Sequence, residues 1–341
     1  MNSHQQRKEE HLEICLNQPV GFKDVTTGFE KYYFIHQALP ELDLKQIKLD
    51  ITLFNKRLAA PVIISPMVGG IAQATGINRN LATAVQKLGI GMGVGSQRCF
   101  VDDPQVLTSF QVRDVAPDIL LFANLGAVQL NYGFGPDECL KIVESINADA
   151  LILHLNPLQE ALQPEGNTDF STLLPKIENI CRQLSVPVVV KEVGCGISKD
   201  VARQLFEVGV VGLDIAGAGG TCWSKIEQLR QRDKISQNVA GHFASWGIPT
   251  AESLIMAHKG APQLSLIASG GIRTGIDIAK AIALGAEAAG IGAPLLKPAV
   301  DSAEKVVDVL EEIIETLRIT MFCIGVSDIT ALKLTSNLNK V

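Results

Sequence analysis

Short runs of aliphatic residues recur along most of this chain, and a longer segment with apolar residues at helical spacing follows each run. The runs are apolar at successive positions, which predicts strands that are buried on both faces of a parallel sheet. They lie mostly about 25–30 residues apart. The predicted strands are 62–65, 91–95, 119–124, 150–155, 186–191, 212–216, 264–269 and 288–292.

The segments between these runs predict helices that cover the sheet. Eight strand-then-helix units indicate an α/β fold of the (β/α)8 TIM barrel type, in which a ring of helices surrounds eight parallel strands. A doubly wound open sheet is the alternative, but such sheets usually have fewer strands, and no strand-Gly-x-Gly-x-x-Gly-helix unit stands out. The predicted helices are 79–88, 137–146, 173–184, 199–208, 251–259, 275–284 and 302–317.

Residues 1–60 do not fit this repeat, and we expect them to form an N-terminal arm and a short hairpin. A helical pattern runs from the charged start of the chain to Leu16, and apolar residues alternate with polar ones over 43–54. Such alternation predicts a hairpin strand packed on the bottom or side of the barrel. Residues 61–341 then form the barrel, and one connection, at about 217–247, is long enough to act as a lid.

The composition adds limits on the class of protein. The chain is 47% hydrophobic and 19% charged, which is typical of a globular domain, and its net charge of −6 argues against a general nucleic-acid surface. Its seven cysteines include no Cys-x-x-Cys pair, which predicts reduced thiols. The start lacks a signal-peptide core, and no apolar run reaches ~18 residues. We therefore expect a soluble, cytoplasmic protein that does not enter a membrane.

The fourth predicted strand ends in four closely spaced polar residues, His154, Asn156, Gln159 and Glu160. Barrel enzymes build their active sites at the carboxyl ends of the strands, so this block is the leading candidate for catalysis. The alternative is that His154 caps a strand and Glu160 begins a solvated helix. Polar or glycine-rich residues also follow four other strands, which favours a site: Ser65-Pro66-Met67-Val68, Gly95-Ser96-Gln97-Arg98, Asn124 and Thr221.

Glycine-containing loops follow the seventh and eighth strands, as Ser269-Gly-Gly271-Ile272-Arg273 and Gly290-Ile-Gly292-Ala293. Consecutive glycines let backbone N–H groups approach a phosphate, and a helix N-terminus favours its negative charge. Barrels often bind a phosphate between these two strands. The loops therefore predict a phosphate site, with a pair of tight turns as the alternative.

Lys191 ends the fifth apolar run. A buried ammonium group needs an anionic partner or solvent. Its neighbour Glu192 would point to the opposite face of the strand, so a salt bridge between the two is disfavoured. The sequence therefore favours a bound cofactor as the partner of Lys191.

Taken together, these motifs resemble the type 2 isopentenyl diphosphate isomerases, and the resemblance runs from about residue 5 to 330. The pair Arg7-Lys8 with the His154-to-Glu160 block is its specific part, whereas Gly-Gly-Ile-Arg is shared by several FMN- and phosphate-binding barrels. Val68 stands where the family often has a threonine at the flavin, which leaves a backbone contact there. The motifs are Arg7-Lys8-x-x-His11, Met67-x-Gly-Gly, Gly95-Ser-Gln-Arg98, His154-x-Asn-x-x-Gln-Glu160, Lys191-Glu, Ala218-Gly-Gly-Thr221-x-Trp223, Trp246-Gly-Ile-Pro-Thr and Gly270-Gly-Ile-Arg273.

This resemblance implies an FMN-dependent barrel enzyme that interconverts isopentenyl and dimethylallyl diphosphate by a 1,3-proton shift. The active flavin is reduced, with NADPH as reductant, and Mg²⁺ accompanies the substrate. A homo-oligomer, tetrameric or octameric, is also implied.

The resemblance assigns roles to particular residues. Ser65, Pro66, Met67, Val68, Ser96, Asn124, Lys191 and Thr221 would contact the flavin, and Gly271, Ile272, Arg273, Gly292 and Ala293 its phosphate. Arg7, Lys8, His11, Ser96, Arg98, His154, Asn156 and Gln159 would bind the substrate, and Glu160 the metal. Gln159, His154 and Lys191 are the expected catalytic residues. We expect residues 1–11 and 221–246 to close over the substrate, with Glu227 or Asp233 pairing with the arm.

Two other enzyme classes share parts of this pattern. A 2-hydroxy-acid oxidase would need a His-Gly-Gly-Arg segment near the seventh strand, and His242 is not followed by glycines. An inosine-monophosphate-dehydrogenase-like enzyme would need a cysteine nucleophile, for which Cys222 is the candidate. Within the isomerase interpretation, the proton donor stays open between the flavin and Gln159 with water.

Overall fold

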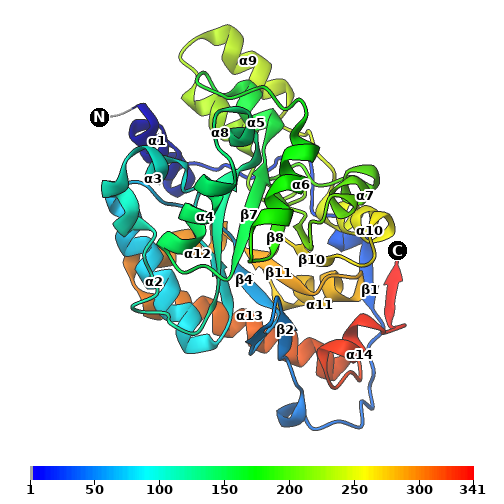
Figure 1. Cartoon of the computed structure of the whole chain (residues 1–341). Helices are drawn as coiled ribbons and strands as arrows, with labels where there is room; N and C mark the ends of the chain where they lie inside the picture. The colour runs from blue at the N-terminus through cyan, green and yellow to red at the C-terminus, as the bar shows by residue number, and fades with distance from the viewer. Residues whose placement is uncertain (1–2) are drawn as a thin grey trace.

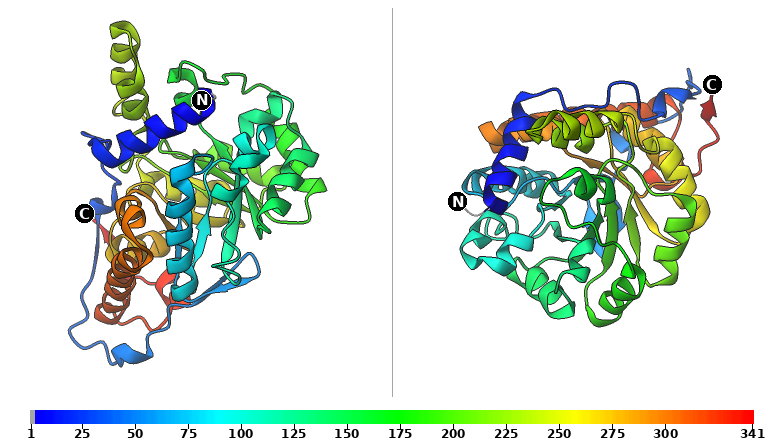
Figure 2. Two further views of the ribbon diagram at one scale, coloured as in Figure 1. Left: turned by 90° about the vertical axis from the view of Figure 1, so that its left-hand side faces the viewer. Right: turned by 90° about the horizontal axis from the view of Figure 1, so that it is seen from above.

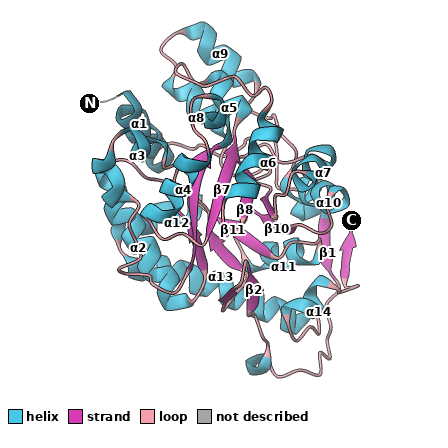
Figure 3. Ribbon diagram, in the orientation of Figure 1, coloured by secondary structure: helices cyan, strands magenta, loops and turns pink. Residues whose placement is uncertain are grey.

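The computed structural model describes residues 3–341 and contains a closed barrel of eight parallel strands in the ring order β10-β11-β4-β5-β6-β7-β8-β9 (Figures 1 and 3). Each strand falls on one predicted run, so the predicted TIM barrel is confirmed. Residues 1–2 of the predicted arm lie outside the described residues. The barrel strands are β4 Val62–Ile64, β5 Gly91–Gly93, β6 Leu120–Gly126, β7 Ala150–Leu155, β8 Val188–Glu192, β9 Gly212–Asp214, β10 Ser265–Ala268 and β11 Ala288–Ile291.

Helices surround the barrel in the connections where the sequence predicts them. Two are longer than predicted: α2 begins at Ala72 rather than at 79, and α13 continues to Cys323 rather than to 317. The added turns bury Ile77 and Met321, so packing on the barrel extends both helices beyond their clearest sequence pattern. The helices around the barrel are α2 Ala72–Leu88, α3 Arg98–Asp102, α4 Pro136–Ser145, α5 Pro157–Leu162, α6 Leu173–Gln183, α7 Lys199–Glu207, α10 Thr250–Gly260, α11 Gly275–Ala283, α12 Ala293–Asp301, α13 Ala303–Cys323 and α14 Ile329–Lys333.

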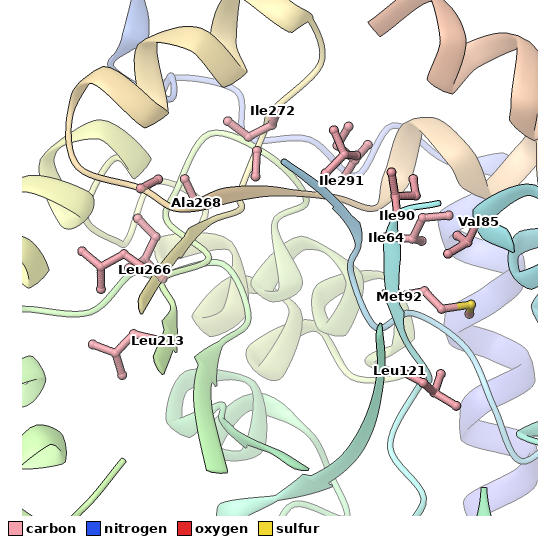
Figure 4. Packing of buried hydrophobic residues seen from close by; sticks show 14 of the residues in the cluster. Ile64, Val85, Ile90, Met92, Leu121, Leu213, Leu266, Ala268, Ile272 and Ile291 are labelled. Carbon is pink, nitrogen blue, oxygen red and sulfur yellow. The ribbon is translucent and has the colours of Figure 1, made fainter. Parts of the chain in front are cut away.

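Residues alternate along each barrel strand between the interior and the helices. In Figure 4, outward residues such as Ile64, Leu121 and Leu266 belong to the large core between the strands and the helices. The inward residues of the lower layer form a separate apolar cluster that includes Phe122 and Val189. Two residues further along, the inward positions of six of the eight strands are polar and form a layer at the carboxyl end: Ser65, Asn124, His154, Lys191, Asp214 and Ser269.

A two-stranded hairpin, β2 Ile51–Leu53 and β3 Lys56–Leu58, packs its apolar residues against the lower interior cluster and closes the amino end of the barrel. Its turn residues Phe54 and Asn55 have φ of 47° and 62°, the positive values that a tight hairpin turn requires. The predicted alternation over 43–54 is only partly a strand. Leu44–Gln46 is a 3-10 turn, because the Asp43 carboxylate accepts a hydrogen bond from the Lys45 N–H.

The N-terminal helix α1, Ser3–Asn17, lies at the other end of the barrel, near α8 Trp223–Arg230 and α9 Lys234–His242 (Figures 1 and 2). The predicted lid-like connection is thus largely helical. The last strand, β12 Leu338–Lys340, pairs antiparallel with β1 Tyr32–Phe34. Among residues 3–341, no helix is both long and apolar enough to cross a membrane.

The hairpin gives a prediction about stability. Leu58 is 1% exposed within the lower cluster, so Leu58→Ala should leave a cavity and lower the free energy of unfolding by about 2–4 kcal/mol. Leu39→Ala is the control, because Leu39 is 78% exposed and its truncation should change stability by less than about 0.5 kcal/mol. Urea unfolding of both variants measures the difference. Equal urea midpoints in the two variants would show that the hairpin does not contribute to stability through Leu58.

Candidate active site

A cavity of about 310 Å³ opens at the carboxyl ends of the barrel strands. Every site residue predicted from the sequence lines it, although the role of each residue stays a prediction. The predicted residues brought together here are Arg7, Lys8, His11, Ser65, Pro66, Met67, Val68, Ser96, Arg98, Asn124, His154, Asn156, Gln159, Glu160, Lys191, Thr221, Gly271, Ile272, Arg273, Gly292 and Ala293.

A buried ion pair lies in the polar layer at the base of this cavity. Lys191 Nζ is 2.9 Å from Asp214 Oδ2 and donates to Ser269 Oγ at 3.2 Å, and Ser269 Oγ donates to Asp214 Oδ1 at 2.5 Å. The expectation that a cofactor is the partner of Lys191 therefore needs correction, because a protein carboxylate is already paired with it. Sequence reasoning missed Asp214, although a carboxylate in the middle of the otherwise apolar run 212–216 was a signal. Its place beside Lys191 follows from the strand register.

Glu192 points away from Lys191, as the strand geometry predicts. Its carboxylate accepts hydrogen bonds from the backbone N–H groups of the loop that follows β8, at 2.7 Å from Val193 and from Gly194. Burial raises the pKa of Glu192 to about 7, although these N–H groups oppose that rise. Glu192 thus organises the loop that carries Val193 and Gly194 into the cavity wall.

His154 is held as a neutral ring in the same layer. Its Nδ1 lies 2.8 Å from Asn124 Oδ1, while Asn124 Nδ2 donates to the Val94 carbonyl. Because an amide oxygen only accepts, Nδ1 carries the proton and Nε2 is left as an acceptor. Burial, with smaller contributions from the charges of Lys191 and Lys8, lowers the pKa of His154 to about 4.

The His154-to-Glu160 block bends back on itself at the start of α5. Asn156 Nδ2 donates to Glu160 Oε1 at 3.0 Å and to Gln159 Oε1 at 3.1 Å, and the Asn167 N–H donates to Glu160 Oε2 at 2.6 Å. Glu160 is only 8% exposed, so the alternative of a solvated helix start is wrong. Among the described residues that line the cavity, Glu160 is the one carboxylate.

Two arginines give this cavity unsatisfied positive groups. Arg7 Nη1 and Arg98 Nε are buried without a hydrogen-bond partner, while Arg98 Nη1 donates to Asn167 Oδ1 at 2.7 Å. Burial lowers the pKa of Arg7, and the carboxylate of Glu160 partly opposes this. Buried donors without partners are costly, so this part of the cavity is suited to an anion that supplies acceptors.

Lys8 ties the N-terminal arm to the barrel. Its Nζ donates to the carbonyls of Gly69 at 2.8 Å and Ser96 at 2.9 Å, and lies 3.2 Å from Cys99 Sγ. These contacts occupy the three donor positions of an ammonium group. Burial lowers the pKa of Lys8. In this arrangement Lys8 fixes the arm, and its predicted contact with a substrate would require one of these bonds to be exchanged.

His11 fixes the arm at a second point. His11 Nε2 lies 2.9 Å from Glu227 Oε1 on α8, and its ring meets Trp223 edge-on with 5.2 Å between centroids. Glu227 also accepts from Arg230 at 2.8 Å and from Gln159 at 3.4 Å. Burial alone would raise the pKa of Glu227, but the hydrogen bond and charge of His11, with Arg230, lower it. Of the two expected partners, Glu227 pairs with the arm, and closure of the arm over a substrate stays a prediction.

The glycine loops form the part of the wall expected to hold a phosphate. Gly270 and Gly271 have φ of 100° and 83°, which only glycine adopts without strain, and a Cβ on Gly271 would collide with the Gly219 carbonyl at 2.6 Å. Gly292 precedes the first turn of α12, so the N-terminus of this helix begins at the cavity. A group of three or more metal-ligating side chains is absent from residues 3–341.

The alternative based on a cysteine nucleophile finds no support in this geometry. Cys222 is buried, its Sγ lies 3.1 Å from Ser224 Oγ, and it is not among the residues that line the cavity. A nucleophilic thiolate would need access to the substrate and a positive neighbour. Cys222 instead packs at the start of α8.

Comparisons with known proteins identify the family of this chain. The family model described as FMN-dependent dehydrogenase matches residues 154–339. The chain is 48% identical to an isopentenyl-diphosphate delta-isomerase of Nostoc sp., over 99% of this chain and 96% of the relative. It is 52% identical to one of Synechococcus sp., over 96% and 94%. An isopentenyl-diphosphate delta-isomerase of Oceanobacillus iheyensis is 46% identical over 98% and 96%.

Solved structures of more distant proteins share the fold. A mandelate oxidase variant with a monooxide FMN adduct has a TM-score of 0.64 at 18% identity, covering 98% of this chain and 92% of that one. A flavocytochrome b2 variant with pyruvate has a TM-score of 0.69 at 16% identity, covering 97% and 82%. At these identities the likeness concerns the fold alone. The near full-length matches at 46–52% identity show that this chain belongs to the type 2, FMN-dependent isopentenyl-diphosphate delta-isomerase family.

Proposed function

We propose that this protein interconverts isopentenyl and dimethylallyl diphosphate by a 1,3-proton shift, with reduced FMN and Mg²⁺ and with NADPH as reductant. The observation that carries the proposal is that one cavity contains two regions. One is a wall of glycine loops beside a lysine, and the other holds unpaired arginine donors beside one glutamate. The first region suits a flavin phosphate and ring, and the second suits a diphosphate with its metal ion.

FMN fits the wall formed by the loops after β10 and β11. Gly270 and Gly271 hold the tight turn of this wall with positive φ, and the start of α12, after Gly292, contributes its positive dipole end. Ser65 Oγ is buried without a hydrogen-bond partner in the polar layer, and Lys191 retains a third donor. When bound and reduced, FMN supplies a ring nitrogen that can exchange a proton.

Mg²⁺ with a diphosphate fits the region around Glu160. Mg²⁺ commonly takes one or two carboxylate ligands together with phosphate oxygens and waters, so one glutamate is sufficient. Each carboxylate oxygen of Glu160 accepts one hydrogen bond and keeps a further lone pair for a metal ion. The unpaired N–H groups of Arg7 and Arg98 would donate hydrogen bonds to the phosphate oxygens.

The residues of the chain would then orient the substrate and restrict its access to water. Asn156 and Glu227 fix the Gln159 carboxamide from its two ends, because Oε1 accepts from Asn156 and Nε2 donates to Glu227. With Nδ1 bound to Asn124, His154 leaves Nε2 as a hydrogen-bond acceptor in the cavity lining. The arm, held by Lys8 and His11, covers the cavity and supplies Arg7. A cytoplasmic location and a homo-oligomeric state stay predictions.

The proposal predicts a specific pattern of cofactor use. Purified protein incubated with FMN should absorb at about 450 nm, as bound oxidised flavin does. With NADPH and Mg²⁺ it should convert isopentenyl diphosphate to dimethylallyl diphosphate with many turnovers per NADPH oxidised, because the reaction has no net redox change. A 2-hydroxy acid added instead should not reduce the flavin. A protein that takes up no FMN, or that consumes one NADPH per product, would contradict the proposal.

A second prediction concerns the metal. Glu160→Gln keeps the shape and removes the charge, so FMN binding should persist while kcat falls by at least about 100-fold and responds weakly to added Mg²⁺. Glu165→Gln is the matched control, because Glu165 pairs with Arg230 outside the cavity lining. Its kcat and its Mg²⁺ dependence should stay close to those of the parent. An unchanged Mg²⁺ dependence in Glu160→Gln would remove the metal role.

A third prediction follows from the lowered pKa of His154. Its folded value of about 4 lies below the ordinary 6.5, so the unfolded chain binds this proton more readily. The stability due to neutral His154 is complete above about pH 6.5 and is lost as the pH falls toward about 4. Urea unfolding without substrate should show that His154→Asn loses about 1–3 kcal/mol less than the parent across this window. Parallel losses in the two proteins would show that His154 is not held neutral.

A further inference from the structure

Lys191 and Asp214 form a closed pair of opposite charges at the carboxyl end of the barrel. They are in register on the neighbouring strands β8 and β9, and both side chains are at most 9% exposed. Ser269, which directly follows β10, forms hydrogen bonds with both of them. The two charges therefore have almost no solvent to screen them, and each depends on the other for stabilisation.

Only one member of the pair, Lys191, lines the cavity. Lys191 and Ser269 line it, whereas Asp214 does not and is only 3% exposed. Asp214 therefore cannot touch a ligand directly, and its effect on a ligand passes through Lys191 and through its own charge. Other titratable groups near Lys191 are His154, the next strand partner on β7, and Glu192, which points to the opposite face.

The net charge of this pair matters for a flavin that exchanges protons. An unpaired lysine would favour an anionic reduced ring strongly, which suits redox chemistry. A group that both gives and takes a proton works best when its two protonation states are close in free energy near the working pH. A lysine whose charge is balanced by a carboxylate provides a donor at the ring without a full unit of positive charge.

We propose that Asp214 is a positioning residue that balances the charge of Lys191, so that the site holds reduced FMN in both its neutral and its anionic form. This inference rests on the proposed function, because it takes FMN as the ligand over Lys191. It adds a role for a residue that has no contact with the cavity. The net charge of the pair is zero in the native protein, +1 after Asp214→Asn and −1 after Lys191→Met, and is zero again in the double variant.

These charges predict an ordered set of ionisation constants for the bound reduced flavin. Anaerobic titration of the reduced holoprotein, followed by flavin absorbance, should give a lower flavin pKa in Asp214→Asn and a higher one in Lys191→Met, each by about one unit or more. The double variant should return close to the parent. The midpoint potential of the flavin should change in the opposite sense to its pKa, highest in Asp214→Asn and lowest in Lys191→Met, because added positive charge favours the reduced anion.

Asp149→Asn is the control for loss of a carboxylate elsewhere in the barrel. Asp149 precedes β7 at the opposite end and pairs with Arg113 at 2.6 Å. Its removal should leave the flavin pKa unchanged even if it lowers stability. If Asp214→Asn does not hold FMN, the comparison of Lys191→Met with the double variant measures the same carboxylate, because the second substitution should lower the pKa again.

The outcomes separate this inference from the function on which it rests. A parent protein that never binds FMN overturns both. If the parent binds FMN, two results would overturn the role of Asp214 alone. One is a flavin pKa that is unchanged or raised in Asp214→Asn. The other is a double variant whose flavin pKa stays as far from that of the parent as in Lys191→Met. A purely structural role would not produce shifts of opposite sign that cancel.

Discussion

The strict alternation of side chains along the barrel strands determines where chemistry can occur in this protein. Inward residues such as Phe122 and Val189 fill the lower interior, and the next inward residues, two positions on, form the polar layer. The hairpin closes the barrel from below with Leu53 and Leu58. Polar groups at the upper layer therefore rest on a rigid apolar base and open only toward the cavity.

In that position the polar groups must find hydrogen-bond and charge partners within the layer. A charge on a barrel strand lies in a poorly hydrated region, so it must be paired or neutral. Lys191 is paired with Asp214, and His154 is held as a neutral ring by Asn124. Above them, Glu160 is bound by Asn156 and by the backbone of Asn167. Charged donors of Arg7 and Arg98 are left without partners, which marks the region where an anionic ligand would be most stabilised.

The N-terminal arm and α8 complete the cavity as one unit. Lys8 is bound to the loops after β4 and β5, and His11 is bound to Glu227. Glu227 in turn contacts Gln159, so the arm, α8 and the His154-to-Glu160 block share hydrogen bonds. A change in the position of the arm would therefore move Arg7 and alter the support of the Gln159 carboxamide together. This arrangement links the position of the arm to that of the His154-to-Glu160 block.

The sequence alone determined the barrel, because eight apolar runs with helical segments between them have few other ways to bury their surfaces. It also located strand-end residues of the cavity such as His154 and Lys191, since the carboxyl ends of parallel strands meet at one face, whereas Arg7, Lys8 and His11 came from the resemblance to the isomerase family. Only the tertiary structure decided the partners. Asp214 stands beside Lys191 because of strand register, and Lys8 is engaged by carbonyls because the arm folds over the barrel. Periodicity fixes the face on which a residue lies, whereas a pair between distant segments depends on how those segments are placed in space.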